Sequence, residues 1–273
     1  MTGATGLTPS VFRLYVDLVR KRTGLVMSES RRDRLTTRLW AQARAEGSFA
    51  RLYARLRELP TDSPAFGQLL DAASDTRSAF FEDSASLDAL SDEIAPERLL
   101  ALGADGVLDV WCVGCATGEE PYSLAIRLQE KGIAPGRRVR IRGTDISPDV
   151  IRRARDGVFA AHSLRPVSPE RRATFFEPAG EGRFRIKEPV LSAVYFATRS
   201  LLDEPKGSGA FDAILCRNVL PFLEEDVRGR AVETLALFLK PGGYLLLGRE
   251  DGVAAASTPL TVVPLRNDIA YRR

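Results

Sequence analysis

The sequence has 273 residues, of which 44% are apolar and 27% charged, and its formal net charge is +3. This composition excludes a disordered chain and provides enough apolar residues for one large domain, or for a small domain beside a larger one. No stretch is long and apolar enough to cross a membrane, and no basic start followed by an apolar stretch marks an export signal. We therefore expect a cytoplasmic protein without membrane insertion.

The first seventy residues are more basic than the rest of the chain. They contain twelve Lys or Arg and six Asp or Glu, a balance of +6, which leaves −3 for the remainder. Helix-start residues followed by apolar residues at helical spacing occur at Thr8, at Ser28 or Ser30, at Ser48 and at Ser63. The pattern predicts a basic helical N-terminal domain, whose arginines form either a solvated face or a docking surface for an acidic partner.

A polar stretch with an embedded aromatic pair follows this domain. Such stretches are typical of linkers, but Phe80 and Phe81 need burial, so we expect the segment to pack against the second domain. A helix carrying Leu87, Leu90 and Ile94 then leads to the first strand.

Residues 107–125 predict a strand, a loop of small residues and a helix opened by Pro121. Small residues at the carboxyl end of a strand let a nucleotide-like ligand approach the backbone of an open α/β sheet. The phosphate-cradling pattern that ends in a lysine is absent, and the adjacent Glu119 and Glu120 would repel a pyrophosphate. Because these carboxylates can hold an ammonium or a ribose, we expect a cationic nucleoside rather than NAD or ATP.

A second strand, residues 139–144, ends at Asp145, and Ser147 with Pro148 starts another helix. An acidic residue at the end of the second strand of such a sheet is a common partner of the two ribose hydroxyls. Asp145 could instead cap the following helix. We favour the ribose because the rest of the pattern agrees with it.

The remaining elements alternate between strand and helix. Strands at 190–196, 211–216 and 244–248 and a helix at 224–239 indicate a parallel sheet with helices on both faces. Residues 157–190 interrupt this order with a short β excursion, either an edge strand or a hairpin. Residues 240–243 predict a turn, and the tail after residue 260 predicts a closing hairpin.

Residues suited to metal or redox chemistry are scarce. Cys112 and Cys115 form a single C-x-x-C pair, Cys216 is the remaining cysteine, and His162 is the only histidine. We therefore expect reduced thiols that line a loop or a strand, and no metal site.

Four runs of residues carry a more specific pattern: Trp111–Ala125, Gly143–Ile146, Cys216–Leu220 and Leu239–Tyr244. Over nearly the whole chain, the sequence resembles the chemotaxis receptor methyltransferases, the CheR family. The resemblance implies an α/β fold: a Rossmann-like S-adenosylmethionine-dependent methyltransferase sheet with a small all-helical N-terminal domain and a small β excursion at about 160–189. The implied parts are an N-terminal domain over 1–73, a linker over 74–86 that contributes to the cofactor site, and a methyltransferase domain over 87–273.

The resemblance also implies an activity and partners. S-adenosylmethionine would donate a methyl group to glutamate side chains of chemoreceptors, leaving S-adenosylhomocysteine as product. The cytoplasmic helices of the receptor would dock through Arg31, Arg34 and Arg38. Relatives often continue into regulatory repeat domains, so a further domain beyond the C-terminus is an open expectation. Nucleic acid is not expected as a partner, because basic stretches interleaved with base-stacking aromatic residues are absent.

Residue by residue, the resemblance assigns roles around the cofactor. Glu120 would face the methionine end of the cofactor, Asp145 would hold the ribose, and Asn218 and Val219 would lie against the adenine. Arg217 is the candidate catalytic residue, because it would orient the acceptor carboxylate. As an arginine beside a strand end, it could equally be a structural tie. The other implied cofactor-binding residues are Thr76, Ser78, Glu82, Ser200 and Leu201.

Three departures from the family pattern concern this site. Glu82 stands where the family usually has an arginine, Pro221–Phe222 where Ile-Tyr is usual, and residues 249–251 replace a His-Ser-Glu type ending. A charge reversal at Glu82 would weaken cofactor binding through like-charge repulsion, unless Arg77 or another arginine takes over the role. The departures keep two alternatives open beside the active enzyme: a regulatory module that binds S-adenosylmethionine with weak or no methyl transfer, and a methyltransferase with another substrate.

Overall fold

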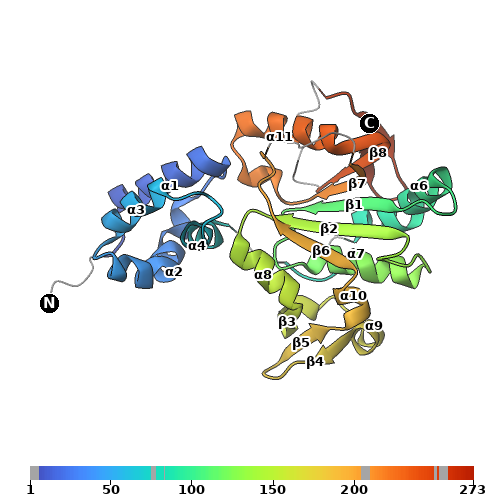
Figure 1. The fold of residues 1–273 in the computed structure, drawn as a ribbon, viewed down its shortest axis with the longest axis horizontal. Helices are drawn as coiled ribbons and strands as arrows, with labels where there is room; N and C mark the ends of the chain where they lie inside the picture. Colours follow the sequence, from blue (N-terminus) through green and yellow to red (C-terminus); the bar gives the residue numbers. More distant parts are fainter. Residues whose placement is uncertain (1–5, 75–77, 83, 204–209, 249–250, 252–257) are drawn as a thin grey trace.

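The computed structural model describes the chain except for residues 1–5, 75–77, 83, 204–209, 249–250 and 252–257. Figure 1 shows two bodies of unequal size, a helical bundle near the N-terminus and a larger α/β body that contains the sheet. Short helices that follow the bundle in the sequence, α5 (Ala85–Ala89) and α6 (Ala95–Leu102), lead into the sheet with a π-helical turn between them.

The N-terminal bundle consists of α1 (Pro9–Thr23), α2 (Arg32–Ala45), α3 (Phe49–Glu58) and α4 (Pro64–Ala73). The side chains of Thr8, Ser48 and Ser63 cap α1, α3 and α4 by accepting a backbone N–H of the first turn. α2 begins later than the sequence indicates, because residues 29–31 form a short 3-10 turn ahead of it. Buried residues from all four helices form a core of their own.

The central sheet has the strand order β6-β2-β1-β7-β8-β10-β9. Its parallel strands are β1 (Leu108–Val113), β2 (Val139–Asp145), β6 (Val194–Thr198), β7 (Phe211–Cys216) and β8 (Leu239–Leu247). β10 (Ile269–Arg272) runs antiparallel to both β8 and β9 (Thr261–Pro264), so the closing hairpin extends the same sheet. The expected α/β fold with a mainly parallel sheet is confirmed.

Helices cover both faces of this sheet. Alternate residues of β1 face opposite ways: Val110 and Cys112 pack in the core that includes α7 (Glu119–Glu130), while Trp111 and Val113 pack in the core that includes α11 (Glu225–Phe238). After β1 the chain builds β2 and β6 on one side, then crosses to β7 and β8 on the other. The chain that leaves β1 leads to α7 on one face, and the chain that leaves β7 leads to α11 on the other. Open α/β sheets bind ligands at such a point.

Three segments differ from the sequence-based expectation. The excursion is a three-stranded antiparallel sheet in the order β3-β5-β4 (Val158–Ala160, Arg183–Ile186, Phe176–Pro178), with α9 (Pro169–Phe175) ahead of β4. A short helix, α10 (Glu188–Leu191), delays the start of β6. The expected turn at 240–243 is an irregular part of β8, since Leu239 pairs with Phe211 but Tyr244 already pairs with Ala213.

Candidate cofactor site

The loop after β1 brings its backbone close to the neighbouring strand end. Gly114 has φ +63°, and a Cβ on it would lie 2.4 Å from Cγ2 of Val219. No side chain fits in that space, and the left-handed backbone also favours glycine. The small residue predicted from the sequence is therefore required by a close approach of two chain segments.

Two cavities meet at this loop. The larger, about 570 Å³, lies between the loop and the linker and is lined by Ser78, Ala79, Phe81, Glu82, Leu87, Gly114, Cys115, Ala116, Glu120, Arg217, Asn218, Pro221 and Phe222. The smaller, about 110 Å³, lies toward the end of β2, and its lining includes Asp145, Ile146, Ser200, Leu201 and Val219. Both are lined by Gly114, Asn218 and Phe222, so they adjoin across the strand ends.

A buried ion pair forms part of the wall of the larger cavity. Nη1 of Arg217 lies 3.0 Å from Oε2 of Glu120, and Nη2 donates to the backbone carbonyl of Glu82 at 3.1 Å. The side chains of Arg217 and Glu120 are only 5% and 17% exposed. Burial raises the pKa of Glu120, and the charge of Arg217 opposes that shift. Arg217 is thus a structural tie as well as a positive charge in the cavity wall.

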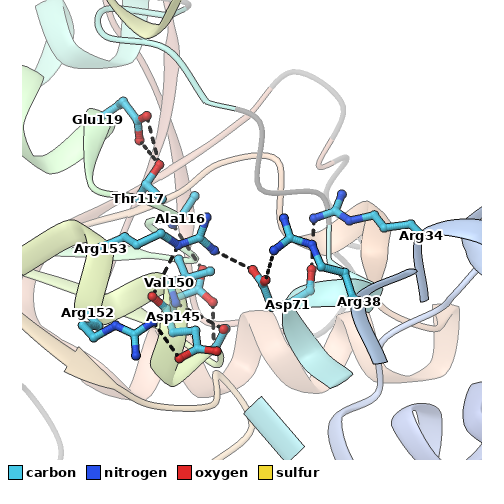
Figure 2. A network of polar contacts seen from close by, with 12 residues as sticks. Arg34, Arg38, Asp71, Ala116, Thr117, Glu119, Asp145, Val150, Arg152 and Arg153 are labelled. Atoms are coloured by element: carbon cyan, nitrogen blue, oxygen red, sulfur yellow. Dashed lines mark hydrogen bonds and ion pairs between the residues drawn. The ribbon is translucent and has the colours of Figure 1, made fainter. Parts of the chain in front are cut away.

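Asp145 connects the ends of β1 and β2. Its Oδ2 accepts from the backbone N–H of Ala116 at 3.2 Å, and its Oδ1 accepts from that of Ser147 at 3.0 Å (Figure 2). The cap of α8 (Pro148–Asp156) is the hydroxyl of Ser147, so Asp145 is not the helix cap. Burial raises the pKa of Asp145 to about 6, although three backbone N–H groups oppose the shift. The carboxylate remains available to the smaller cavity, which it lines.

Asn218 and Val219 lie in a loop that a single carboxylate holds in place. Both oxygens of Asp251 accept backbone N–H groups: those of Asn218 and Gly248 at 2.7 Å each, and those of Val219 and Leu220 at 3.1 and 3.0 Å. From the sequence, Asp251 was noted only within a departure from the family pattern, and this role was not predicted. Its one sequence signal was an acidic residue shortly after the strand that ends near Gly248.

The linker supplies a third side of the larger cavity. The ring of Phe80 packs edge-on against Phe159 and Phe176 of the excursion, at 4.8 and 4.9 Å between centroids. Phe81 lines the cavity, and its N–H donates to Oγ of Ser123 at 2.9 Å. Glu82, in the same wall, has an exposed side chain whose Oε2 accepts from the N–H of Ala79.

The structure therefore gathers most of the expected site residues around one groove. Ser78, Glu82, Glu120, Arg217 and Asn218 line the larger cavity, and Asp145, Ser200, Leu201 and Val219 line the smaller one together with Asn218. Thr76 lies outside the described residues, as do Arg77, Arg249 and Glu250.

One wall of the smaller cavity was not anticipated. Thr23, Leu25, Val26, Ala73 and Ser74 line it, and all come from the N-terminal bundle or its edges. The bundle is held there by backbone hydrogen bonds, from Val26 N to Phe222 O at 2.7 Å and from Glu224 N to Gly24 O at 3.0 Å. No local sequence pattern encodes a contact between segments about two hundred residues apart.

The described residues also bear on metal sites, thiol chemistry and membrane spans. Among them, no group of three His, Cys, Asp or Glu side chains is arranged to hold a metal ion. The three cysteines are buried and free, and burial raises the pKa of each thiol, which makes the reactive thiolate scarce. No helix in the described part of the chain meets the length and apolarity that a membrane span requires.

The groove fits an elongated nucleoside with a positive end. Glu120, in the first turn of α7 after β1, lines one cavity, and Asp145, at the end of β2, lines the other. Gly114, where a Cβ would meet Val219, lines both cavities. Carboxylates suit an ammonium group and a ribose diol, and the apolar wall of Ile146, Leu201 and Val219 suits a base.

Comparisons with known proteins identify the family of this chain. A chemotaxis protein methyltransferase of Vibrio parahaemolyticus is 34% identical over 209 residues, 74% of this chain and 74% of that protein. Chemotaxis protein methyltransferase 1 of Vibrio cholerae is 30% identical over 280 residues, which cover 100% of this chain and 99% of that protein. The chemotaxis protein methyltransferase of Escherichia coli is 29% identical over 278 residues, which cover 99% of this chain and 93% of that protein. Residues 76–269 match the family model described as CheR methyltransferase, SAM binding domain. This chain therefore belongs to the CheR methyltransferase family, and its cofactor is S-adenosylmethionine.

Proposed function

We propose that this chain transfers the methyl group of S-adenosylmethionine to glutamate side chains of chemoreceptors. The observation that carries the proposal is the buried Glu120–Arg217 pair in the wall of the larger cavity, which offers both an acceptor for an ammonium and a positive charge for a carboxylate. The proposal is also supported by relatives, about 30% identical over the chain, that are named chemotaxis protein methyltransferases. The acceptor residue is inferred from the family resemblance.

The chemistry requires little from the protein beyond positioning. When bound, S-adenosylmethionine supplies a methyl group on a positively charged sulfur. A glutamate carboxylate is ionised near neutral pH, so its oxygen forms the new bond to carbon while the carbon–sulfur bond breaks. The electron pair of the broken bond stays on sulfur and no proton moves, which removes the need for a general base. The protein contributes alignment and a site sheltered from water.

Arg217 suits the task of orienting the acceptor without neutralising it. A free arginine beside the acceptor would bind the carboxylate tightly and reduce its nucleophilicity. Here Arg217 already shares its charge with Glu120 and donates to the carbonyl of Glu82. We infer that the acceptor meets a partly compensated positive charge, which attracts the carboxylate but holds it loosely.

We propose that the receptor docks on α2. Arg31, Arg34 and Arg38 lie at or near its N-terminal half, and the side chain of Arg38 is 53% exposed. A basic helix face attracts an acidic receptor helix, and the attraction weakens as ionic strength rises. Arg31→Glu should therefore reduce transfer to a receptor fragment while leaving cofactor affinity unchanged.

A second candidate function is a regulatory module that binds the cofactor with weak or no methyl transfer. It is favoured by Glu82, which places a negative charge in the wall of the larger cavity, and by Phe222, which lines both cavities without a hydroxyl. Glu82 is also integrated into the linker, since its carboxylate accepts from Ala79 and its carbonyl from Arg217.

One experiment separates the candidates. The protein is incubated with S-adenosylmethionine labelled in the methyl group and with a chemoreceptor cytoplasmic fragment, and base-labile label on the fragment is counted. Asp145→Ala serves as a control with impaired cofactor binding. Base-labile label supports the methyltransferase. Measured cofactor binding without transfer supports the regulatory module, and label on nucleic acid or on a small molecule would instead assign another substrate.

A further inference from the structure

Two helices meet where the N-terminal bundle joins the methyltransferase body. α4 of the bundle lies against α8, the helix that follows Asp145, and in Figure 1 the two are neighbours between the bodies. The contact is tight, because a Cβ on Gly67 would lie 2.9 Å from Cδ of Pro148. Asp71 lies one helical turn after Gly67 and therefore faces the same neighbour.

Asp71 carries a buried carboxylate that two helices share. Its Oδ1 lies 2.6 Å from Nη2 of Arg153 on α8, and its Oδ2 lies 3.6 Å from Nη1 of Arg38 on α2. Its backbone carbonyl accepts from Nη2 of Arg34 at 3.0 Å. Figure 2 shows the three arginines pointing toward Asp71, Arg34 and Arg38 from the bundle and Arg153 from the methyltransferase body. Asp71 is only 6% exposed, whereas the side chains of Arg153 and Arg38 are 40% and 53% exposed. The carboxylate is therefore buried, while its arginine partners reach it from the surface.

This cluster lies within a few residues of both walls of the smaller cavity. Ala73 and Ser74, two and three residues after Asp71, form part of the bundle wall, while Asp145 and Ile146, shortly before α8, form part of the opposite wall. The negative charge of Asp71 also contributes, after burial, to the raised pKa of Asp145. The contact between Asp71 and α8 therefore joins the two segments that carry these walls.

We propose that Asp71 is a positioning residue for the cofactor: by joining α2 and α4 to α8, it holds the bundle as the second wall of the nucleoside end of the groove. The inference rests on the cofactor assignment and is independent of which acceptor is methylated. Asp71 does not itself line either cavity. Its loss should therefore act on cofactor affinity through the spacing of the walls.

The test compares Asp71→Asn, Arg153→Gln and the double variant by calorimetric titration with S-adenosylhomocysteine, at a temperature where thermal unfolding shows each protein folded. Each single variant should weaken binding about tenfold, which corresponds to about 1.4 kcal/mol of lost binding free energy. The double variant should be no weaker than the single ones, because both remove the same contact. Arg152→Gln is the matched control, since the neighbouring Arg152 is 70% exposed and pairs with Asp149 of its own helix.

The outcomes separate a positioning role from a merely structural one. A structural role would lower the unfolding temperature and leave the dissociation constant of the folded variants at the wild-type value, which overturns the proposal. Additive losses in the double variant, or an equal loss in Arg152→Gln, overturn it too. If Asp71→Asn does not fold, the cofactor affinities of Arg153→Lys and Arg153→Gln are compared instead. A higher affinity of Arg153→Lys, which retains the charge, supports the contact, and equal affinities refute it.

Discussion

Asp251→Asn tests the most concentrated set of hydrogen bonds at the site. The wild-type carboxylate accepts four backbone N–H groups, two on each oxygen. An asparagine keeps one acceptor oxygen, and its amide N–H₂ group faces the two remaining donors in either orientation. Each buried donor left without an acceptor costs about 1–3 kcal/mol, so two of them should lower the free energy of unfolding by about 2–6 kcal/mol. This is a large fraction of the total stability of a typical protein, about 5–15 kcal/mol.

Urea unfolding measures the loss of stability, and calorimetric titration with S-adenosylhomocysteine measures the loss of affinity that follows from displacing Asn218 and Val219. Asp203→Asn is the matched control, because Asp203 is exposed and accepts a single backbone N–H, that of Ser200 at 2.9 Å. We expect the control to change the free energy of unfolding by less than about 1 kcal/mol. If Asp251→Asn stays within the same limit, the four hydrogen bonds do not hold the loop and the reasoning fails.

The remaining predictions concern the groove itself. Gly114→Ala should destabilise the fold by about 2–5 kcal/mol through backbone strain and overpacking against Val219, measured by urea unfolding; Gly132→Ala, with similar φ but nothing within 4 Å, should show the strain alone. Asp145→Ala should weaken cofactor binding by about 1–3 kcal/mol, and unchanged affinity would refute the ribose role. Because a protonated Asp145 is a poorer acceptor, wild-type affinity should fall as pH drops through about 6, and a titration of Asp145→Ala should lack that dependence. Glu82→Arg should raise affinity or transfer if the charge reversal is a handicap; a loss would show that its own contacts matter more.

Sequence patterns were informative wherever neighbours along the chain decide the structure. Helix caps at Thr8, Ser48 and Ser63 depend on a side chain and an N–H three residues away, so their signal is local. The small residues after β1 and the acid after β2 follow from the geometry of single strand–loop–helix units. For the same reason, the alternation of strands and helices was sufficient to predict the parallel sheet.

Errors arose where backbone pairing with a distant strand overrides local preference. Residues 240–243 look like a turn in the sequence, but pairing of β8 with β7 keeps them in the strand as an irregularity. Asp145 is a different case, because the sequence was compatible with two roles, ribose binding and capping of the following helix. Only the position of Ser147 relative to Val150 showed which residue caps the helix.

The sequence by itself determined the fold class, the order of the elements and the acidic side chains that follow β1 and end β2, because these depend on local periodicity and on short-range geometry. The tertiary structure decided which distant residues complete the groove: Asp251 beneath the loop at Asn218, and the N-terminal bundle as a second wall held through Asp71. These contacts join residues tens to hundreds of positions apart. Their energies depend on burial and on hydrogen-bond geometry that exists only once the chain has folded.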